Sequence, residues 1–516
     1  MNKVLLSLTL ALCAATSLAA PASKVPATPK PEPPLFLYPA CPCYHLKGIG
    51  SGDTRLDAKV NPPESATALR VTFDVSDSNG KVIQNASANV SKPGFVGVNI
   101  RVPVQALAAF NVRARLLDSA GKELASATTD IHVAPREQSD VRLGSDGYLR
   151  VAGQPEFVLG MYSAGHFDQM GKAGFNATHS YAITTGEADE PINPTDNRVK
   201  QLLDNSWTNG MRLMVELPRK AIEKASWDQV RRRIETFRYH PGLLCWGSEE
   251  RVARGVAPLT NIATLYKIVH ELDPARPLVL GDTKDKIAKF KTDRRDFFPD
   301  PYMDAGIWWW YPIPLKEPDA NGLDGREQSA GAMLNPPAWL TTTISKRPLW
   351  IAIQSYQHPS KDARFPTPAE YRCMAYISII NGVKGLWFYT GSGQKDYLGK
   401  PAGLLNKMEE GHWDYVKNLV GELKEFSPVI MAQPSAGKVS LSPPDAPIEF
   451  TTRELGAKLF LLTANKSEKA QTATFKSPAL IGKHATLLYE SRKANVTGDS
   501  LGDSFEPFAV HLYRFE

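Results

Sequence analysis

The sequence predicts an α/β protein built on a closed (β/α)8 barrel, with one β-sandwich domain before the barrel and another after it. Between residues 141 and 430, short apolar runs alternate eight times with helix-length amphipathic segments, which is the pattern of a parallel sheet. On both sides of this region the chain alternates at strand period between turn residues, which is typical of antiparallel sandwiches. Eight units in roughly 250 residues favour closure into a ring.

Composition agrees with a globular, several-domain protein. The chain has 516 residues, of which 42% are hydrophobic, and this is enough apolar surface for two or three separate cores. The net charge of +6 is spread along the chain. Because it is not gathered in one basic arm, it indicates ordinary solubility and argues against nucleic acid as a partner.

The N-terminus predicts export. Residues 1–20 hold a short basic start, an apolar centre and small residues before a cut, as in a cleaved signal peptide, and they are too short for a membrane span. Residues 21–35 are rich in Pro and Ala and predict a linker. No later stretch is apolar enough to cross a bilayer. The mature protein is therefore expected to be secreted or periplasmic, without a membrane as partner.

Cysteine and glycine patterns give no sign of a metal or a cofactor. Cys41 and Cys43 have no second pair of ligands, so they predict buried free thiols or one N-terminal disulfide. There is no His-Glu-x-x-His motif, no phosphate-binding glycine loop and no nucleophile elbow. We expect neither metal nor cofactor.

The domains follow in order. Residues 36–138 predict the N-terminal accessory β-sandwich, residues 141–430 the barrel, and residues 434–516 the C-terminal β-sandwich. The barrel strands are placed at 157–162, 175–181, 211–217, 243–248, 277–281, 303–309, 348–354 and 385–389. Capping boxes predict helix starts after Ser226 and Thr367.

The fourth of these strands ends in two adjacent carboxylates, Glu249 and Glu250. In a (β/α)8 barrel the C-terminal ends of the strands carry the active site. The alternative to a catalytic role is that both glutamates only form ion pairs on a loop, with Arg251, Arg254 or Lys220.

Two segments resemble TIM-barrel glycoside hydrolases of the large retaining superfamily, such as β-galactosidases and cellulases. Residues 146–162 are similar to the entry into their catalytic barrel, and HPGLLCWGSEE at 240–250 is similar to the end of their fourth strand. The resemblance covers residues 141–430. It implies that Glu250 is the general acid and that Glu249 stands where an Asn or Asp usually contacts the sugar. The charge of Glu249 favours the protonated form of Glu250, which suits an acid.

The seventh strand departs from this family, because it ends in Gln354 where the retaining enzymes have a nucleophilic glutamate. Three alternatives follow. In the first, a carboxylate at the end of another strand is the second catalytic group, and the enzyme inverts the anomeric configuration. A substrate acetamido group attacks, oriented by Gln354. Or the barrel only binds glycans. The candidate carboxylates are Glu216 and Asp282, with Asp300 and Asp304 beside the sixth strand.

Aromatic residues predict the sugar contacts, since sugar C–H faces pack on aromatic rings. The candidates are Tyr162 and Tyr181 at the ends of the first two strands, Tyr311 after the sixth, and Trp387 and Tyr389 at the end of the eighth. Tyr311 and Trp387 are preferred, and core packing is the alternative. Neighbours within the run at 308–310 point to opposite faces, so one or two of these Trp residues belong to the core.

The sequence thus predicts an exported glycoside hydrolase acting on O-glycosidic bonds of an oligo- or polysaccharide. The alternative from another class is a catalytically inactive, glycan-binding barrel. A polysaccharide lyase is a third possibility. It would need a cation or an arginine beside a uronate, and only Arg219 and Arg251 suggest one.

Overall fold

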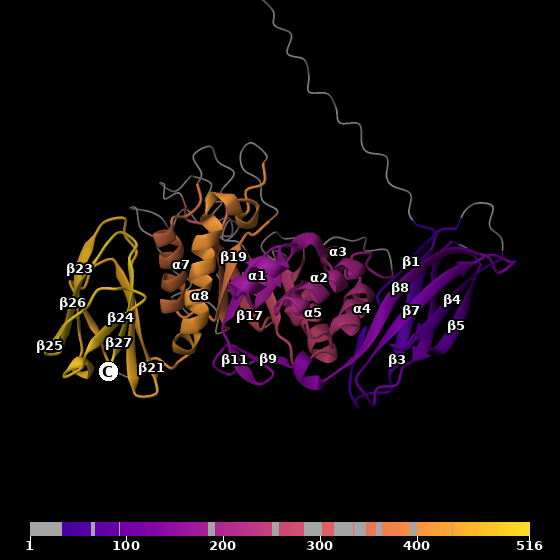
Figure 1. Ribbon diagram of the computed structural model, residues 1–516, viewed down its shortest axis with the longest axis horizontal. Coiled ribbons are helices and arrows are strands. Elements are labelled where there is room, and N and C mark those ends of the chain that lie inside the picture. The colour runs from indigo at the N-terminus through magenta and orange to yellow at the C-terminus, as the bar shows by residue number, and fades with distance from the viewer. Residues whose placement is uncertain are drawn as a thin grey trace, which may run out of the picture.

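The computed structural model describes residues 33–62, 68–91, 93–183, 191–249, 257–282, 302–313, 334, 347–357, 364–392, 400–435 and 437–516. Three units lie in a row, with the barrel between an N-terminal and a C-terminal β-domain (Figure 1). The predicted fold class is confirmed, because eight parallel strands close into one barrel and sheets flank it on both sides. The predicted signal peptide and most of the linker lie outside the described residues.

The N-terminal domain has two facing sheets around a common core. One sheet has the order β1–β3–β6, from Leu35–Leu37, Asp53–Val60 and Gly94–Arg101. The other has the order β2–β8–β7–β4–β5, from Tyr44–Leu46, Glu123–Ala134, Ala108–Leu117, Leu69–Ser76 and Val82–Val90. Along β4 every second residue is buried, as one-sided packing requires. Cys41 and Cys43 are buried free thiols, which settles the open alternative against a disulfide.

The barrel strands are parallel neighbours in chain order, and the last pairs with the first. They are β12 (Val158–Tyr162), β13 (Ala177–His179), β14 (Arg212–Glu216), β15 (Leu243–Glu249), β16 (Leu278–Asp282), β17 (Ala305–Trp310), β18 (Leu349–Gln354) and β19 (Gly385–Tyr389). Every predicted strand is present, within two residues at either end. A small sheet of β9 (Val141–Leu143), β10 (Leu149–Val151) and β11 (Gln154–Glu156) packs Val141 and Leu149 into the same cluster as the barrel interior.

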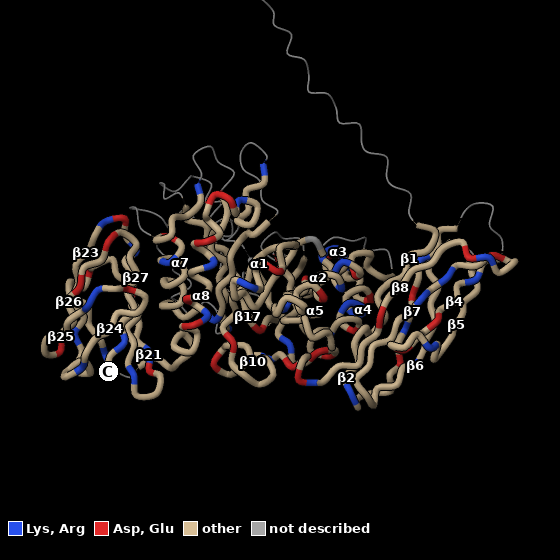
Figure 2. The backbone as a smooth tube through the Cα atoms, in the orientation of Figure 1, with Lys and Arg blue, Asp and Glu red and all other residues tan. Residues whose placement is uncertain are grey.

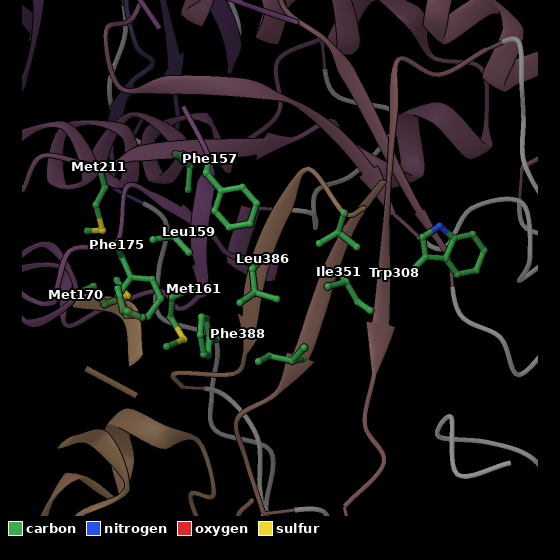
Figure 3. Packing of buried hydrophobic residues seen from close by; sticks show 14 of the residues in the cluster. Phe157, Leu159, Met161, Met170, Phe175, Met211, Trp308, Ile351, Leu386 and Phe388 are labelled. Atoms are coloured by element: carbon green, nitrogen blue, oxygen red, sulfur yellow. The ribbon is translucent and has the colours of Figure 1, made fainter. Parts of the chain in front are cut away.

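Helices cover the outside of the barrel. The described ones are α1 (Phe167–Ala173), α2 (Asp196–Thr208), α3 (Arg219–Glu223), α4 (Trp227–Phe237), α5 (Leu259–Leu272), α7 (Pro368–Ile380) and α8 (His412–Ile430). The described 3-10 turns are η1 (Arg136–Ser139), η2 (Tyr181–Ile183), η6 (Leu404–Asn406), η7 (Met408–Glu410) and η8 (Pro478–Leu480). Outward side chains of the strands pack against the helices, as Leu159, Met161 and Phe388 do beside Met170 (Figure 3).

The two predicted capping boxes differ in outcome. At α7 the box is complete, since Thr367 accepts from the N–H of Glu370 and the Glu370 carboxylate accepts from the N–H of Thr367. At α4 the helix begins where predicted, but Ser226 makes no side-chain cap. Gln229 instead accepts a hydrogen bond from buried Asn193 at 3.3 Å. The box at Ser226 was wrong: the N–H of Ser226 donates to the carbonyl of Ala221 at 2.8 Å, and Gln229 is used by the tertiary contact.

The C-terminal domain is again two facing sheets with a shared core. One has the order β20–β23–β26–β25, from Ser440–Ser442, Gln471–Lys476, Ser500–Phe505 and Val496–Thr497. The other has the order β21–β22–β27–β24, from Ile448–Leu455, Lys458–Asn465, Val510–Phe515 and Ala485–Leu488. It contacts α7 through Arg372, which donates to the carbonyl of Val510 at 2.6 Å.

The N-terminal domain meets the barrel through ion pairs. Lys200 on α2 lies 2.8 Å from Asp130 of β8 and 2.8 Å from Asp204 of its own helix. Arg232 on α4 lies 2.8 Å from Asp57 of β3. Elsewhere basic and acidic residues are interspersed over all three units (Figure 2), in line with the even charge distribution expected from the sequence.

Candidate active site

The predicted site residues lie at one end of the barrel, because the parallel strands all present their C-terminal ends to the same mouth. Tyr162 ends β12, Glu216 ends β14, Glu249 ends β15 and Gln354 ends β18. Asp282 ends β16, but its side chain lies outside the described residues. Glu250 follows β15 directly and also lies outside them, so its role as general acid stays a prediction.

Glycines inside the strands make room for this mouth. A Cβ at Gly247 would lie 2.7 Å from Oε2 of Glu216, and a Cβ at Gly160 would lie 2.2 Å from the ring of Trp387. A Cβ at Gly281 would lie 3.1 Å from Cγ of Glu249. Side chains of alternate strand residues point into a barrel, so each missing Cβ opens space for a neighbouring strand's large side chain. The carboxylates therefore depend on glycines of the adjacent strands.

Glu249 is the centre of the site. Its side chain is fully buried, and its Oε1 accepts a hydrogen bond of 2.6 Å from the hydroxyl of Tyr162. Nε2 of His179 lies 3.4 Å from the same oxygen. Tyr181 also donates a hydrogen bond to this carboxylate. Three side chains from three elements thus surround one carboxylate at the end of the fourth strand.

Glu216 lies beneath Glu249 and is hydrogen-bonded to its main chain. Oε1 of Glu216 accepts from the N–H of Glu249 at 2.9 Å and lies 3.5 Å from Nη2 of Arg219. The guanidinium of Arg219 lies 5.0 Å from the centre of the Tyr181 ring, within the range of a cation–π contact. Glu216 thus forms a structural ion pair with Arg219. A catalytic role for Glu216 stays a prediction.

The two carboxyl groups have opposite pKa shifts. Burial, and then the nearby charge of Glu249, raise the pKa of Glu216. Burial alone would also raise the pKa of Glu249, but His179, Tyr162 and Tyr181 outweigh it and hold that pKa below its ordinary value. Carboxyl groups with pKa values pushed apart can take separate acid and base roles. Of the two, Glu249 is the carboxyl whose pKa is shifted toward the ionised form.

A ring of tyrosines lines the mouth above these carboxyls. Tyr162 and Tyr389 have ring centres 5.2 Å apart, Tyr311 and Tyr389 stack at 5.3 Å, and Tyr311 and Tyr356 meet edge to face at 5.3 Å. Tyr162 also lies 5.8 Å from Tyr181. The structure thus brings together three of the predicted aromatic residues, Tyr162, Tyr181 and Tyr311. Substrate contact by them remains a prediction.

Trp387 lies deeper than a mouth position. It is fully buried, with its ring 5.8 Å from that of Trp350. On β19 the residue that reaches the tyrosine ring is Tyr389, two positions later on the same face. Sequence reasoning underweighted Tyr389 and missed Tyr356. The usable signal was position, because the last inward residue of a barrel strand is nearest the mouth.

The run at 308–311 divides as alternation predicts. Trp308 and Trp310 are buried in the core between strands and helices, whereas Trp309 packs into the barrel interior. Asp304 precedes β17 and therefore lies at the opposite end of the barrel from the mouth. There it accepts from the N–H of Leu278 at 2.8 Å and lies 3.0 Å from His270. As a possible catalytic partner of Glu250 it is excluded by position.

Gln354 ends β18 as predicted, and its amide is bound to main-chain groups. Its Oε1 accepts from the N–H of Ile313 at 2.9 Å, while its NH2 donates to the carbonyls of Ile313 at 2.8 Å and Tyr356 at 3.3 Å. The side chain is fully buried. Both amide hydrogens are used, so the residue joins the segments after β17 and β18. A contact to substrate by Gln354 stays a prediction.

Among the residues that the structure describes, no group of three His, Cys, Asp or Glu side chains could hold a metal ion. In the same part of the chain, no helix is long and apolar enough to cross a membrane.

No protein-family model and no curated protein sequence matches this chain. Among solved structures, it is similar to a β-glucuronidase of Bifidobacterium dentium bound to coumarin-3-O-glucuronide, at 12% identity and a TM-score of 0.37, over 74% of this chain and 66% of that one. It is similar to a β-glucuronidase of Parabacteroides merdae, at 9% identity and a TM-score of 0.39, over 94% and 74%. It is also similar to an α-amylase of Geobacillus thermoleovorans in complex with acarbose, at 10% identity and a TM-score of 0.47, over 70% and 98%.

The structural neighbours are glycoside hydrolases. The chain spans just under two thirds of the Bifidobacterium dentium enzyme.

Proposed function

We propose that this chain is an exported glycoside hydrolase that cleaves O-glycosidic bonds of an oligo- or polysaccharide, with Glu250 as the proton donor. The observation that carries the proposal is the carboxylate of Glu249, which Tyr162 and His179 hold at the mouth of the barrel directly before Glu250. Glycoside cleavage needs an acid for the leaving oxygen and negative charge near the oxocarbenium-like carbon. Export rests on the signal-like sequence of residues 1–20.

The second catalytic group comes from a neighbouring strand. The strands on either side of β15 end in Glu216 and Asp282. Because Gln354 cannot act as a nucleophile, one of these carboxylates activates water, and the product has the inverted configuration. Proton NMR of the first product formed distinguishes the two anomers. A retained anomer would argue for a covalent or substrate-assisted route instead.

Replacing the proton donor is the decisive experiment. In Glu250→Gln, hydrolysis of a glycan panel should fall by about 10²- to 10⁴-fold, the usual contribution of a general acid. Oligosaccharide binding, measured by calorimetry, should persist. Aryl glycosides with acidic phenol leaving groups should be affected least, because such groups leave without a proton.

Glu409→Gln is the matched control, since Glu409 is an exposed glutamate that also stands in a Glu-Glu pair, beside Glu410. It should behave as wild type. If Glu250→Gln hydrolyses every substrate as fast as wild type, Glu250 is not the acid.

Glycan binding without catalysis is the second candidate, and the observation that favours it is the state of Gln354. The amide is bound to the main chain of Ile313 and Tyr356, at the place where a retaining enzyme keeps its nucleophile. Under this alternative, wild type and Glu250→Gln are equally inert on all glycans and bind the same ones. An unsaturated product absorbing in the ultraviolet would point to a lyase instead.

A further inference from the structure

His179 lies between two acceptors, and both bear on its charge. Its Nδ1 lies 3.2 Å from the carbonyl oxygen of Met214, and its Nε2 lies 3.4 Å from Oε1 of Glu249. A carbonyl oxygen only accepts, so Nδ1 carries a hydrogen. Nε2 makes no hydrogen bond to the described residues, and in the neutral ring its lone pair would lie close to a carboxylate oxygen. A second hydrogen on Nε2 removes this repulsion and makes the ring an imidazolium.

We propose that His179 is a positioning residue held as an imidazolium, which keeps Glu249 permanently ionised beneath the reacting sugar. The charge of His179 is inferred from its contacts with Met214 and Glu249 and from its burial beside a second carboxyl, that of Glu216. Its catalytic consequence rests on the proposed function.

The surroundings of the ring support this charge state. The groups that face it are the carboxyls of Glu249 and Glu216 and the rings of Tyr162 and Tyr181, at 4.7 and 5.1 Å. The one further cation of the described cluster, Arg219, lies beside Glu216. Burial alone would lower the pKa of His179, but the two carboxyls outweigh it and raise that pKa above its ordinary value. Two acidic groups thus face one imidazole in a buried site.

A fixed charge on Glu249 has two effects on the proposed reaction. It favours the protonated form of the adjacent Glu250, as a general acid requires. It also places negative charge near the carbon that becomes positive in the transition state. Neutral His179 would supply neither effect, because Glu249 would then tend to take up a proton in its buried position.

The first test needs no activity. Histidine labelled with ¹⁵N reports protonation directly, and the ten histidines of the chain are few enough to resolve. The His179 signals, assigned by their loss in His179→Gln, should show an imidazolium at pH 8 in wild type. In Glu249→Gln the same ring should be neutral at pH 8. A neutral His179 ring in wild type at pH 7 overturns the proposal.

The second test reads the catalytic consequence. In His179→Gln, Glu249 loses its cation, so the acidic limb of the pH profile of kcat/KM should move to higher pH. On the acidic limb, at a pH below the midpoints of both proteins, the rate should be at least about tenfold lower than in wild type, which corresponds to a limb displaced by about one pH unit. His484→Gln, in the C-terminal domain, should leave the profile unchanged. If the acidic limb of His179→Gln coincides with that of wild type, the residue is merely structural.

The two tests separate this proposal from the proposed function. If wild type hydrolyses no glycan but His179 is an imidazolium, the assigned charge holds and the hydrolase fails. If wild type is active and His179 is neutral, the hydrolase stands and the positioning role is overturned.

Discussion

Two buried histidines in this protein each face a carboxylate, yet their pKa values are shifted in opposite directions. At the mouth of the barrel, Nε2 of His179 lies 3.4 Å from Glu249. At the contact with the N-terminal domain, Nε2 of His240 lies 3.0 Å from Asp204. Both imidazoles are fully buried. The pKa of His179 is raised in spite of burial, through Glu249 and Glu216, whereas burial lowers the pKa of His240.

The difference comes from the other ring nitrogen. Nδ1 of His179 faces a carbonyl of β14 and must carry a hydrogen, while Nδ1 of His240 accepts from the N–H of Gly242 at 2.9 Å and carries none. His240 therefore donates its single hydrogen to Asp204 and stays neutral, and His179 needs a second one. A main-chain contact on one side of a ring thus decides whether the other nitrogen has a hydrogen to donate while the ring is neutral.

The largest expected effect tests whether the two pairs differ in charge. Glu249→Ala breaks a buried ion pair, so that His179 has to give up its second hydrogen or stay charged without a counter-ion, and this should cost about 3–5 kcal/mol in free energy of unfolding. Asp204→Ala takes a hydrogen-bond acceptor away from the neutral ring of His240. Because the Asp204 side chain is 38% exposed, this should cost only about 1 kcal/mol. Urea unfolding followed by circular dichroism measures both. Equal losses would break the comparison, because they would mean that both rings have the same charge.

Gln354 extends the comparison to a neutral buried side chain bound to main chain. In Gln354→Glu the two donated hydrogen bonds are lost, and carboxylate oxygens face the carbonyls of Ile313 and Tyr356. We expect a loss of about 2–3 kcal/mol in urea unfolding and no gain of hydrolysis. The exposed Gln138→Glu serves as control, with a change within about 0.5 kcal/mol. A stable, more active Gln354→Glu would instead show that strand seven is a dormant nucleophile position.

The smallest effect is the pH dependence of stability, which has opposite sign for the two rings. The raised pKa of His179 gives a contribution that is complete below about pH 6.5 and is lost as pH rises through the folded value. The lowered pKa of His240 gives one that is complete above about pH 6.5 and is lost as pH falls. Each slope is at most about 1.4 kcal/mol per pH unit.

Urea titrations of wild type, His179→Gln and His240→Gln between pH 5 and 9 measure these slopes as differences from wild type. Differences of the same sign for both variants would contradict the assigned charges.

The order of the elements was predictable because local pattern carries it. Buried strands are apolar runs of a few residues, and their alternation with amphipathic helices requires a parallel sheet, so the eight barrel strands could be placed from the sequence. Local pattern failed where a distant partner competed. Ser226 and Thr367 both begin a capping-box motif, but only Thr367 caps its helix. At the other helix, Gln229 accepts a hydrogen bond from Asn193 instead.

The sequence by itself determined that Glu216, Glu249 and Gln354 end barrel strands and so share one mouth, since position along a strand is a local property. Only the tertiary structure decided what each one does there. The charge of Glu249 depends on His179 and Tyr162, and Gln354 is bound to Ile313, 41 residues away in the chain. Such partners come from other strands and loops, and hydrogen bonds between them leave no periodic trace in the sequence.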